Sequence, residues 1–215
     1  MSAMNKLPDR ENTNFPLAVT NALKAVSDHK FLLKHQVMPR DFFAHYPKAR
    51  GLLFCHETGS GKSISAAAIA DEFISQGRRV ILVAAASLQN NFRDNIYKFY
   101  ENTTSMSRSA IDALIAKNYA FVSANASNML AQLKNASLPT ELQEVLDADP
   151  DVDVKPPDQK TRAKYMETIN LEGSLVIVDE AHHLFNGIVS SSQNARGMYD
   201  IIMRTKDVKL LFLTS

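Results

Sequence analysis

A glycine-rich segment at residues 56–63 constrains the fold more than any other part of the chain. It reads His-Glu-Thr-Gly-Ser-Gly-Lys-Ser, follows a short apolar run at 51–55 and opens an alanine-rich segment at 62–76. Gly59 and Gly61 permit backbone angles that other residues avoid, so the loop can turn its amide N–H groups inward around a phosphate chain. A strand, a phosphate loop and a helix in this order predict an α/β domain.

The side chains of the loop indicate how a nucleoside triphosphate would be held. The Lys62 ammonium would reach the β- and γ-phosphates, and the Ser63 hydroxyl would bind Mg²⁺. The positive end of the helix that begins near Lys62 would add to the attraction. His56 stands where the general pattern has glycine, and the competing interpretation is an ordinary glycine turn. The predicted nucleotide-binding residues of the loop are His56, Glu57, Thr58, Gly59, Ser60, Gly61, Lys62 and Ser63.

Two carboxylates, Asp179 and Glu180, directly follow another apolar run at 175–178. A parallel sheet would place them at the carboxyl ends of its strands, where ligands bind. Asp179 would hold Mg²⁺ through water, and Glu180 would orient or deprotonate the attacking water. Alone this pair is a common turn, and its functional interpretation depends on the phosphate loop upstream. The doubled histidine at 182–183 suggests zinc as an alternative, but no matching ligand pair follows it.

Apolar runs alternate with helical patterns along the chain, which predicts a parallel sheet covered by helices on both faces. Strands are predicted at 51–55, 80–85, 119–123, 175–178 and 208–213. Helices are predicted at 15–27, 31–46, 62–76, from Ser87 onward, and at 109–117, 128–134 and 195–204. Residues 1–30 are predicted to be an N-terminal helical extension. Residues 138–170, rich in proline and acidic residues, are predicted to be an insertion with a helix near 161–168.

Composition limits the classes of partner and compartment. The chain has 24 lysine and arginine residues against 23 aspartate and glutamate residues, which excludes a histone-like binder but not local contacts to nucleic acid. One cysteine excludes an intramolecular disulfide. The longest aliphatic stretch, 80–86, is far shorter than the roughly 20 residues that span a bilayer, and 1–14 lack a signal-peptide core. We expect a soluble protein inside a cell or virus particle, with no membrane partner.

Two motifs together resemble a known family. Gly59 to Ser63 and the Asp-Glu-Ala-His sequence at 179–182 look like motifs I and II, the Walker A motif and DEAH box, of superfamily 2 helicases and translocases. The resemblance implies a RecA-like ATP-binding domain over residues 31–215, with ATP and Mg²⁺ as cofactors. The implied catalytic residues are Lys62, Asp179, Glu180 and His182.

Weaker segments lie in the order that this family has. Gln36 resembles the glutamine that reads adenine upstream of motif I. Residues 80–88 and 121–127 resemble motifs Ia and Ib, which contact the nucleic-acid backbone, and 213–215 looks like the start of motif III, which links hydrolysis to strand movement. The implied nucleic-acid contacts are Ser87, Leu88, Asn90, Asn125 and Ser127, and the implied coupling residues are Thr214 and Ser215.

Taken singly, these residues have simpler interpretations. Gln36 alone is expected on the surface of a helix, and Ser87 is expected to be an N-cap. Asn125 and Ser127 would equally end a strand and cap the next helix. For Cys55, a packed position at the end of a strand is favoured over a metal site shared with the adjacent histidine.

The residues of these motifs are also similar to those of DNA-dependent ATPases of large DNA viruses. These are the relatives of the poxvirus nucleoside triphosphate phosphohydrolase I and of the early transcription factor subunit, which resemble the Swi2/Snf2 branch. The resemblance implies DNA rather than RNA as the nucleic acid, transcription machinery as a partner, and a virion or viral factory as the location.

The function predicted from the sequence is that of the N-terminal motor half of a nucleic-acid-dependent helicase or translocase. The family needs a second RecA-like domain, whose arginine is worth roughly 10³ to 10⁵ in rate. The chain, which stops within motif III, is therefore predicted to be a fragment that binds ATP weakly and hydrolyses it poorly. The alternatives are a regulatory or transcription-complex subunit without motor activity, and a phosphotransferase with a phosphate loop.

Overall fold

The computed structural model describes residues 31–55, 59, 61–138 and 169–215. The predicted N-terminal extension at 1–30, with its helix at 15–27, lies outside these residues. So does nearly all of the predicted insertion at 138–170, including its helix near 161–168. Within the described residues, no helix is both long and apolar enough to cross a membrane.

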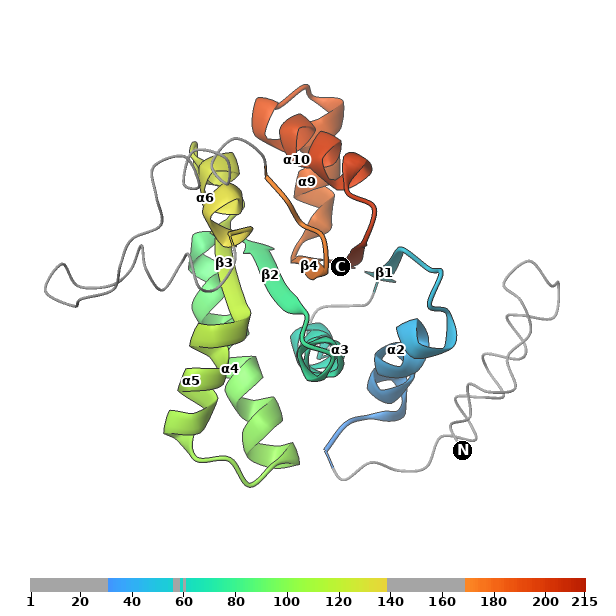
Figure 1. Ribbon diagram of the computed structural model, residues 1–215, viewed down its shortest axis with the longest axis vertical. Helices are drawn as coiled ribbons and strands as arrows, with labels where there is room; N and C mark the ends of the chain where they lie inside the picture. The colour runs from blue at the N-terminus through green and yellow to red at the C-terminus, as the bar shows by residue number, and fades with distance from the viewer. Residues whose placement is uncertain (1–30, 56–58, 60, 139–168) are drawn as a thin grey trace, which may run out of the picture.

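Strands and helices alternate along the described chain (Figure 1). The strands are β1 (Gly51–Cys55), β2 (Arg79–Ala84), β3 (Tyr119–Ser123), β4 (Ser174–Val178) and β5 (Val208–Thr214). The helices are α2 (Lys34–His45), α3 (Lys62–Ser75), α4 (Ala86–Thr103), α5 (Arg108–Asn118), α6 (Met129–Ala136), α9 (Ala181–Val189) and α10 (Gln193–Arg204). All five predicted strands are present.

The five strands form one sheet in the order β1-β5-β4-β2-β3, and every pair is parallel. The prediction of an α/β fold with a RecA-like parallel sheet is therefore confirmed. Since the strands are parallel, all of their carboxyl ends meet at one edge of the sheet. At that edge the chain passes from β1 into the phosphate loop, from β2 into α4, and from β4 into the acidic motif.

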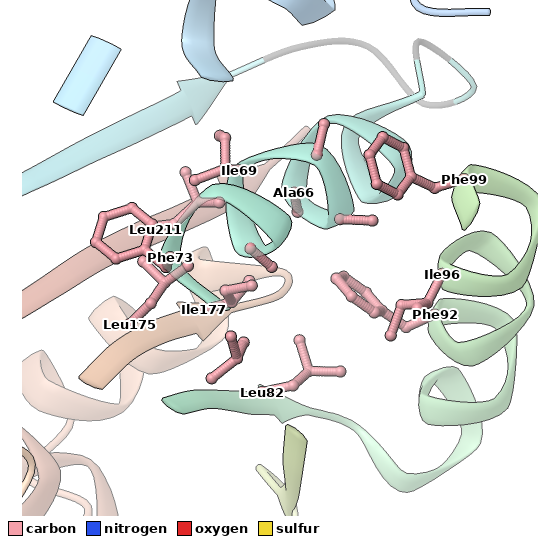
Figure 2. Close-up of a cluster of buried hydrophobic side chains, with 14 of the residues drawn as sticks. Ala66, Ile69, Phe73, Leu82, Phe92, Ile96, Phe99, Leu175, Ile177 and Leu211 are labelled. Atoms are coloured by element: carbon pink, nitrogen blue, oxygen red, sulfur yellow. The ribbon is translucent and has the colours of Figure 1, made fainter. Parts of the chain in front are cut away.

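Helix α3 covers the middle of one face of the sheet. Its alanines are small enough to let the helix lie close to the strands, and Ala66, Ala67 and Ala70 are fully buried. Figure 2 shows α3 between the sheet residues Leu82, Ile177 and Leu211 on one side and the α4 residues Phe92, Ile96 and Phe99 on the other. The core therefore fixes α3, and with it the position of Lys62 in its first turn.

Helices α6, α9 and α10 cover the opposite face (Figure 1). Two glycines allow these helices to approach closely. A Cβ atom on Gly187 would lie 2.8 Å from the Ala195 Cβ, and one on Gly197 would lie 2.7 Å from Leu130 Cδ1. The Ala195 Cβ cannot move away, so no side chain fits at Gly187, whereas at Gly197 the flexible end of Leu130 would have to shift. Through these glycines α9 packs on α10 and α10 packs on α6.

The structure corrects three local predictions. The strand at 51–55 is not fully buried, because β1 is an edge strand and Leu53 is 55% exposed. Cys55 is exposed for the same reason rather than packed. Ser87 does not cap α4, because the helix begins at Ala86 as soon as the chain leaves β2, and its N-cap is Ala85.

The turn between α9 and α10 is a Schellman motif with serine in the glycine position. The Ser192 N–H donates to the Gly187 carbonyl at 2.9 Å, and the Ser191 N–H donates to the Ile188 carbonyl at 3.2 Å. Ser191 has a φ of 67°, in the left-handed region. Glycine usually occupies this position because a Cβ atom is disfavoured there.

We predict that Ser191→Gly raises the free energy of unfolding by about 0.5 to 1 kcal/mol, because it removes the left-handed strain. Urea unfolding followed by circular dichroism measures the change. The matched control is Ser190→Gly, because Ser190 has an ordinary φ of −78°. A glycine there adds backbone entropy to the unfolded chain and removes the exposed hydrogen bond from the Ser190 hydroxyl to the Gly187 carbonyl, so this control should lower the stability. Equal destabilisation by both substitutions would contradict the assignment of strain to Ser191.

Candidate active site

The phosphate loop joins the end of β1 to the start of α3. Gly59 and Gly61 have φ values of 85° and 82°, so both glycines adopt the left-handed conformation that the sequence predicts for them. Lys62 and Ser63 are the first two residues of α3. Four residues of the predicted loop, His56, Glu57, Thr58 and Ser60, lie outside the described residues.

The first turn of α3 has the properties of an anion-binding helix end. Its N-cap is Gly61, so no side chain caps the helix there, and no acidic residue lies in its first turn. The N–H groups of this turn therefore point at the loop with their partial positive charge uncompensated by an N-cap side chain. This arrangement suits a phosphate group held by backbone amides.

Gln36 lies against this loop and not on the surface. Its side chain is only 4% exposed, and its Oε1 accepts a hydrogen bond from the Leu33 N–H at 2.9 Å. A Cβ atom on Gly61 would lie 2.2 Å from Gln36 Nε2, so the amide occupies the space that a side chain at 61 would need. The expectation of an exposed glutamine, drawn from this residue alone, was wrong because α2 packs on α3.

The acidic motif begins where β4 leaves the sheet. The Asp179 N–H still donates to the Val83 carbonyl of β2 at 2.9 Å, which fixes the first carboxylate at the edge of the sheet. Burial raises the pKa of the Asp179 carboxyl. The Glu180 N–H, which donates to Asp179 Oδ1 at 3.1 Å, lowers that pKa, the Glu180 charge raises it, and the Lys62 charge lowers it.

Lys62 begins the helix that follows the phosphate loop, and Asp179 follows β4, so both lie at the carboxyl edge of the sheet. A half-buried carboxylate whose charged form is disfavoured by desolvation is typical of a functional site. A bound cation would relieve that cost. The oxygen ligands offered by Asp179 and by the Ser63 hydroxyl are the kind that Mg²⁺ prefers, so the residues fit this ion.

Glu180 has a strained backbone. Its φ and ψ are 49° and 51°, a left-handed conformation that is uncommon for a residue with a side chain, and it is the N-cap of α9. Such strain persists only where the surrounding structure imposes it, and it clusters at functional positions. The conformation lets β4 turn directly into α9. The sequence did not predict this helix, because no capping residue precedes it.

His182 connects the acidic motif to the last strand. Its Nδ1 lies 3.1 Å from Thr214 Oγ1 and 3.3 Å from Glu180 Oε2. The Ser215 hydroxyl donates to Glu180 Oε2 at 3.5 Å. The structure therefore brings together the four predicted residues Glu180, His182, Thr214 and Ser215, although more than thirty positions separate the two pairs in the sequence.

A pocket of about 380 Å³ lies beside the acidic motif, at the carboxyl ends of β2, β3 and β4. Of the predicted nucleic-acid contacts, Leu88, Asn125 and Ser127 line it, whereas Ser87 and Asn90 are exposed in the first turns of α4 outside it. Asn125 and Ser127 do not cap the next helix, because α6 begins at Met129 with Asn128 as its N-cap.

Sequence reasoning missed two residues of this pocket. His183 lines it next to Glu180, and its ring centroid lies 4.1 Å from that of His182. Asn194 lines it from α10, and its Nδ2 donates to the carbonyls of Ala126 and Ser127 at 3.1 and 3.3 Å. No sequence signal marked Asn194, because an asparagine in a first helical turn is common. Across the described residues, no cluster of three or more metal-binding side chains is found.

Comparisons with known proteins agree with this geometry. The family model described as type III restriction enzyme, res subunit (ResIII), matches residues 17–215. A termination factor NPH-I homolog of African swine fever virus, from a South African tick isolate, is 30% identical over 217 residues, which cover 97% of this chain. Its counterpart in a tick isolate from Malawi is 33% identical over 172 residues, or 77% of this chain.

The chain spans 26% and 20% of the lengths of these two relatives. The match to the family model covers nearly the whole chain, including the phosphate loop, the acidic motif and the strand that carries Thr214. The chain therefore belongs to the ResIII family of helicase-type domains.

Proposed function

We propose that this chain binds and hydrolyses ATP as the N-terminal motor domain of a nucleic-acid-dependent helicase or translocase, over residues 31–215. One observation supports the proposal: Lys62 at the start of α3, Asp179 and Glu180 directly after β4, and Thr214 at the end of β5 all lie at the carboxyl edge of the sheet. The phosphate-binding and hydrolytic groups thus lie at the same edge as Thr214 of β5, the strand between β1 and β4. A nucleotide-driven motor requires these groups to lie together.

Each residue of the site has a role in this proposal. The loop at 56–63 and the first turn of α3 bind the phosphates, and Gln36, which packs against Gly61, is the proposed contact to the adenine. Mg²⁺, held by Ser63 and Asp179, would supply positive charge to the β- and γ-phosphates. Glu180 orients the attacking water and accepts its proton. His182 holds the Glu180 carboxylate in place, since its Nδ1 atom lies 3.3 Å from Glu180 Oε2.

The nucleic acid would bind across the same edge of the sheet, farther along it. Ser87 and Asn90 in the first turns of α4, and Leu88, Asn125 and Ser127 around the pocket, are the proposed contacts. The N-terminus of α4 has no side-chain cap, so its amides suit a backbone phosphate. The relatives' name, termination factor, supports a transcription complex as the partner, and their viral source supports a location in an infected cell or virion. We propose DNA rather than RNA as the nucleic acid because the motifs resemble those of DNA-dependent ATPases.

One prediction from this proposal separates ATP binding from hydrolysis. In the complete natural polypeptide, Lys62→Ala should reduce DNA-stimulated ATP turnover by about 10²- to 10³-fold and weaken ATP binding, because it removes a charge on the phosphates. Glu180→Gln should reduce turnover by about 10²- to 10⁴-fold but retain ATP binding. Phosphate release and fluorescent-nucleotide titration measure the two quantities.

The matched control for Glu180→Gln is Glu172→Gln, which removes an exposed carboxylate near the opposite end of β4. This control should behave as the wild type. Full stimulated turnover in Glu180→Gln would show that Glu180 is not the hydrolytic residue. A wild-type polypeptide that binds ATP without nucleic-acid stimulation would favour a regulatory subunit over a motor.

Another prediction concerns the contact between β5 and the acidic motif. Thr214→Val keeps the shape of the side chain but removes the oxygen near His182 Nδ1, so stimulated turnover should fall by about tenfold, or about 1.4 kcal/mol in the barrier. Thr214→Ser retains the hydroxyl and should restore turnover. If valine and serine gave the same rate, the hydroxyl contact would have no role in coupling.

A further inference from the structure

The loop between β3 and α6 is held by hydrogen bonds from a residue of a different helix, α10. Asn194, in the first turn of α10, donates from Nδ2 to the Ala126 carbonyl at 3.1 Å and to the Ser127 carbonyl at 3.3 Å. Since both partners are carbonyl acceptors, the amide nitrogen must be the group that faces them. The side chains of Asn125 and Ser127 meanwhile remain exposed. One amide therefore sets the direction in which the loop presents its polar side chains.

Asn194 is itself fixed by the packing of α9 and α10. The neighbouring Ala195 lies against Gly187 of α9, where no side chain would fit. The Schellman turn at 190–192 joins the two helices within three residues. Glu180, the strained residue of the acidic motif, is the N-cap of α9. A short, closely packed path thus joins the hydrolytic carboxylate to the loop: Glu180, α9, the contact between Gly187 and Ala195, and Asn194.

We propose that Asn194 is a positioning residue for nucleic-acid engagement: it holds the loop at 124–128 in the shape that binds the backbone of the nucleic acid. The inference deepens the proposed function and rests on it. Asn194 contacts neither nucleotide nor nucleic acid in this proposal, and it acts through the two carbonyls. Its loss therefore changes the concentration of nucleic acid needed for stimulation, and leaves the KM for ATP as it was.

The test measures ATP turnover of the complete natural polypeptide against the concentration of double-stranded DNA, with single-stranded DNA and RNA in parallel. Asn194→Ala removes both hydrogen bonds, and Asn194→Asp replaces the donor with an acceptor that repels the carbonyls. Each should raise the half-saturating DNA concentration by about fivefold to tenfold, while the KM for ATP stays at the wild-type value.

The aspartate variant separates positioning from simple destabilisation. Helix α10 has no acidic residue in its first turn, so an added carboxylate there favours the helix and offsets part of the stability lost with the two hydrogen bonds. The melting temperature should therefore fall no more than in Asn194→Ala, while the half-saturating DNA concentration rises at least as much. Gln193→Asp is the charge control, because it adds the same charge one residue away, at an exposed position. It should leave the half-saturating DNA concentration unchanged.

The outcomes distinguish this inference from the function on which it rests. If the wild type is stimulated by DNA and both Asn194 variants saturate at the wild-type concentration, the positioning role is wrong and the motor function stands. An equal effect of Gln193→Asp would assign the change to charge and overturn the inference. A wild type that no nucleic acid stimulates would overturn both.

Discussion

The whole site depends on the hydrogen bonding of β4 to strands on both sides. This strand lies between β2 and β5, all five of its residues are buried, and its register with each neighbour is continuous. A strand held in this way cannot shift without breaking bonds on two sides. The carboxylates that follow it are therefore delivered to a fixed place, and the Asp179 N–H extends the pairing with β2 by one more bond. Burial then raises the pKa of Asp179 and makes the position favourable for a cation.

Most of the fold was predictable because its signals are local and strong. Apolar runs predicted all five strands, and the glycines at 59 and 61 predicted a loop whose left-handed angles the structure confirms. The exposure of β1 was not predictable, because the sequence does not state which strand lies at the edge of a sheet. Helix α9 was missed because Ala181 to Val189 carries no capping residue, its N-cap being the left-handed Glu180.

The individual motifs of the site were predicted from the sequence, whereas their contacts with other elements were not. The phosphate loop and the acidic motif each have a recognisable order of residues. Each follows a strand of one parallel sheet, which explains why they lie at the same edge. The burial of Gln36 against Gly61 and the contact of Asn194 with the Ala126 carbonyl arise from packing between helices far apart in the sequence. Composition and periodicity do not indicate such contacts, so these contacts could not be predicted from one sequence.

The place of β5 in the sheet has a mechanical consequence. This strand is bonded to β1 through the pairing of Cys55 with Thr214, and to β4 through the pairing of Val178 with Phe212. Phosphate loop and acidic motif are not neighbours in the sheet, and their separation is the sum of two strand spacings with β5 between them. The distance between the phosphate loop and the acidic motif is thus set by the same strand whose last residue, Thr214, lies beside His182. Backbone hydrogen bonds, and not any side chain, therefore determine the width of the site.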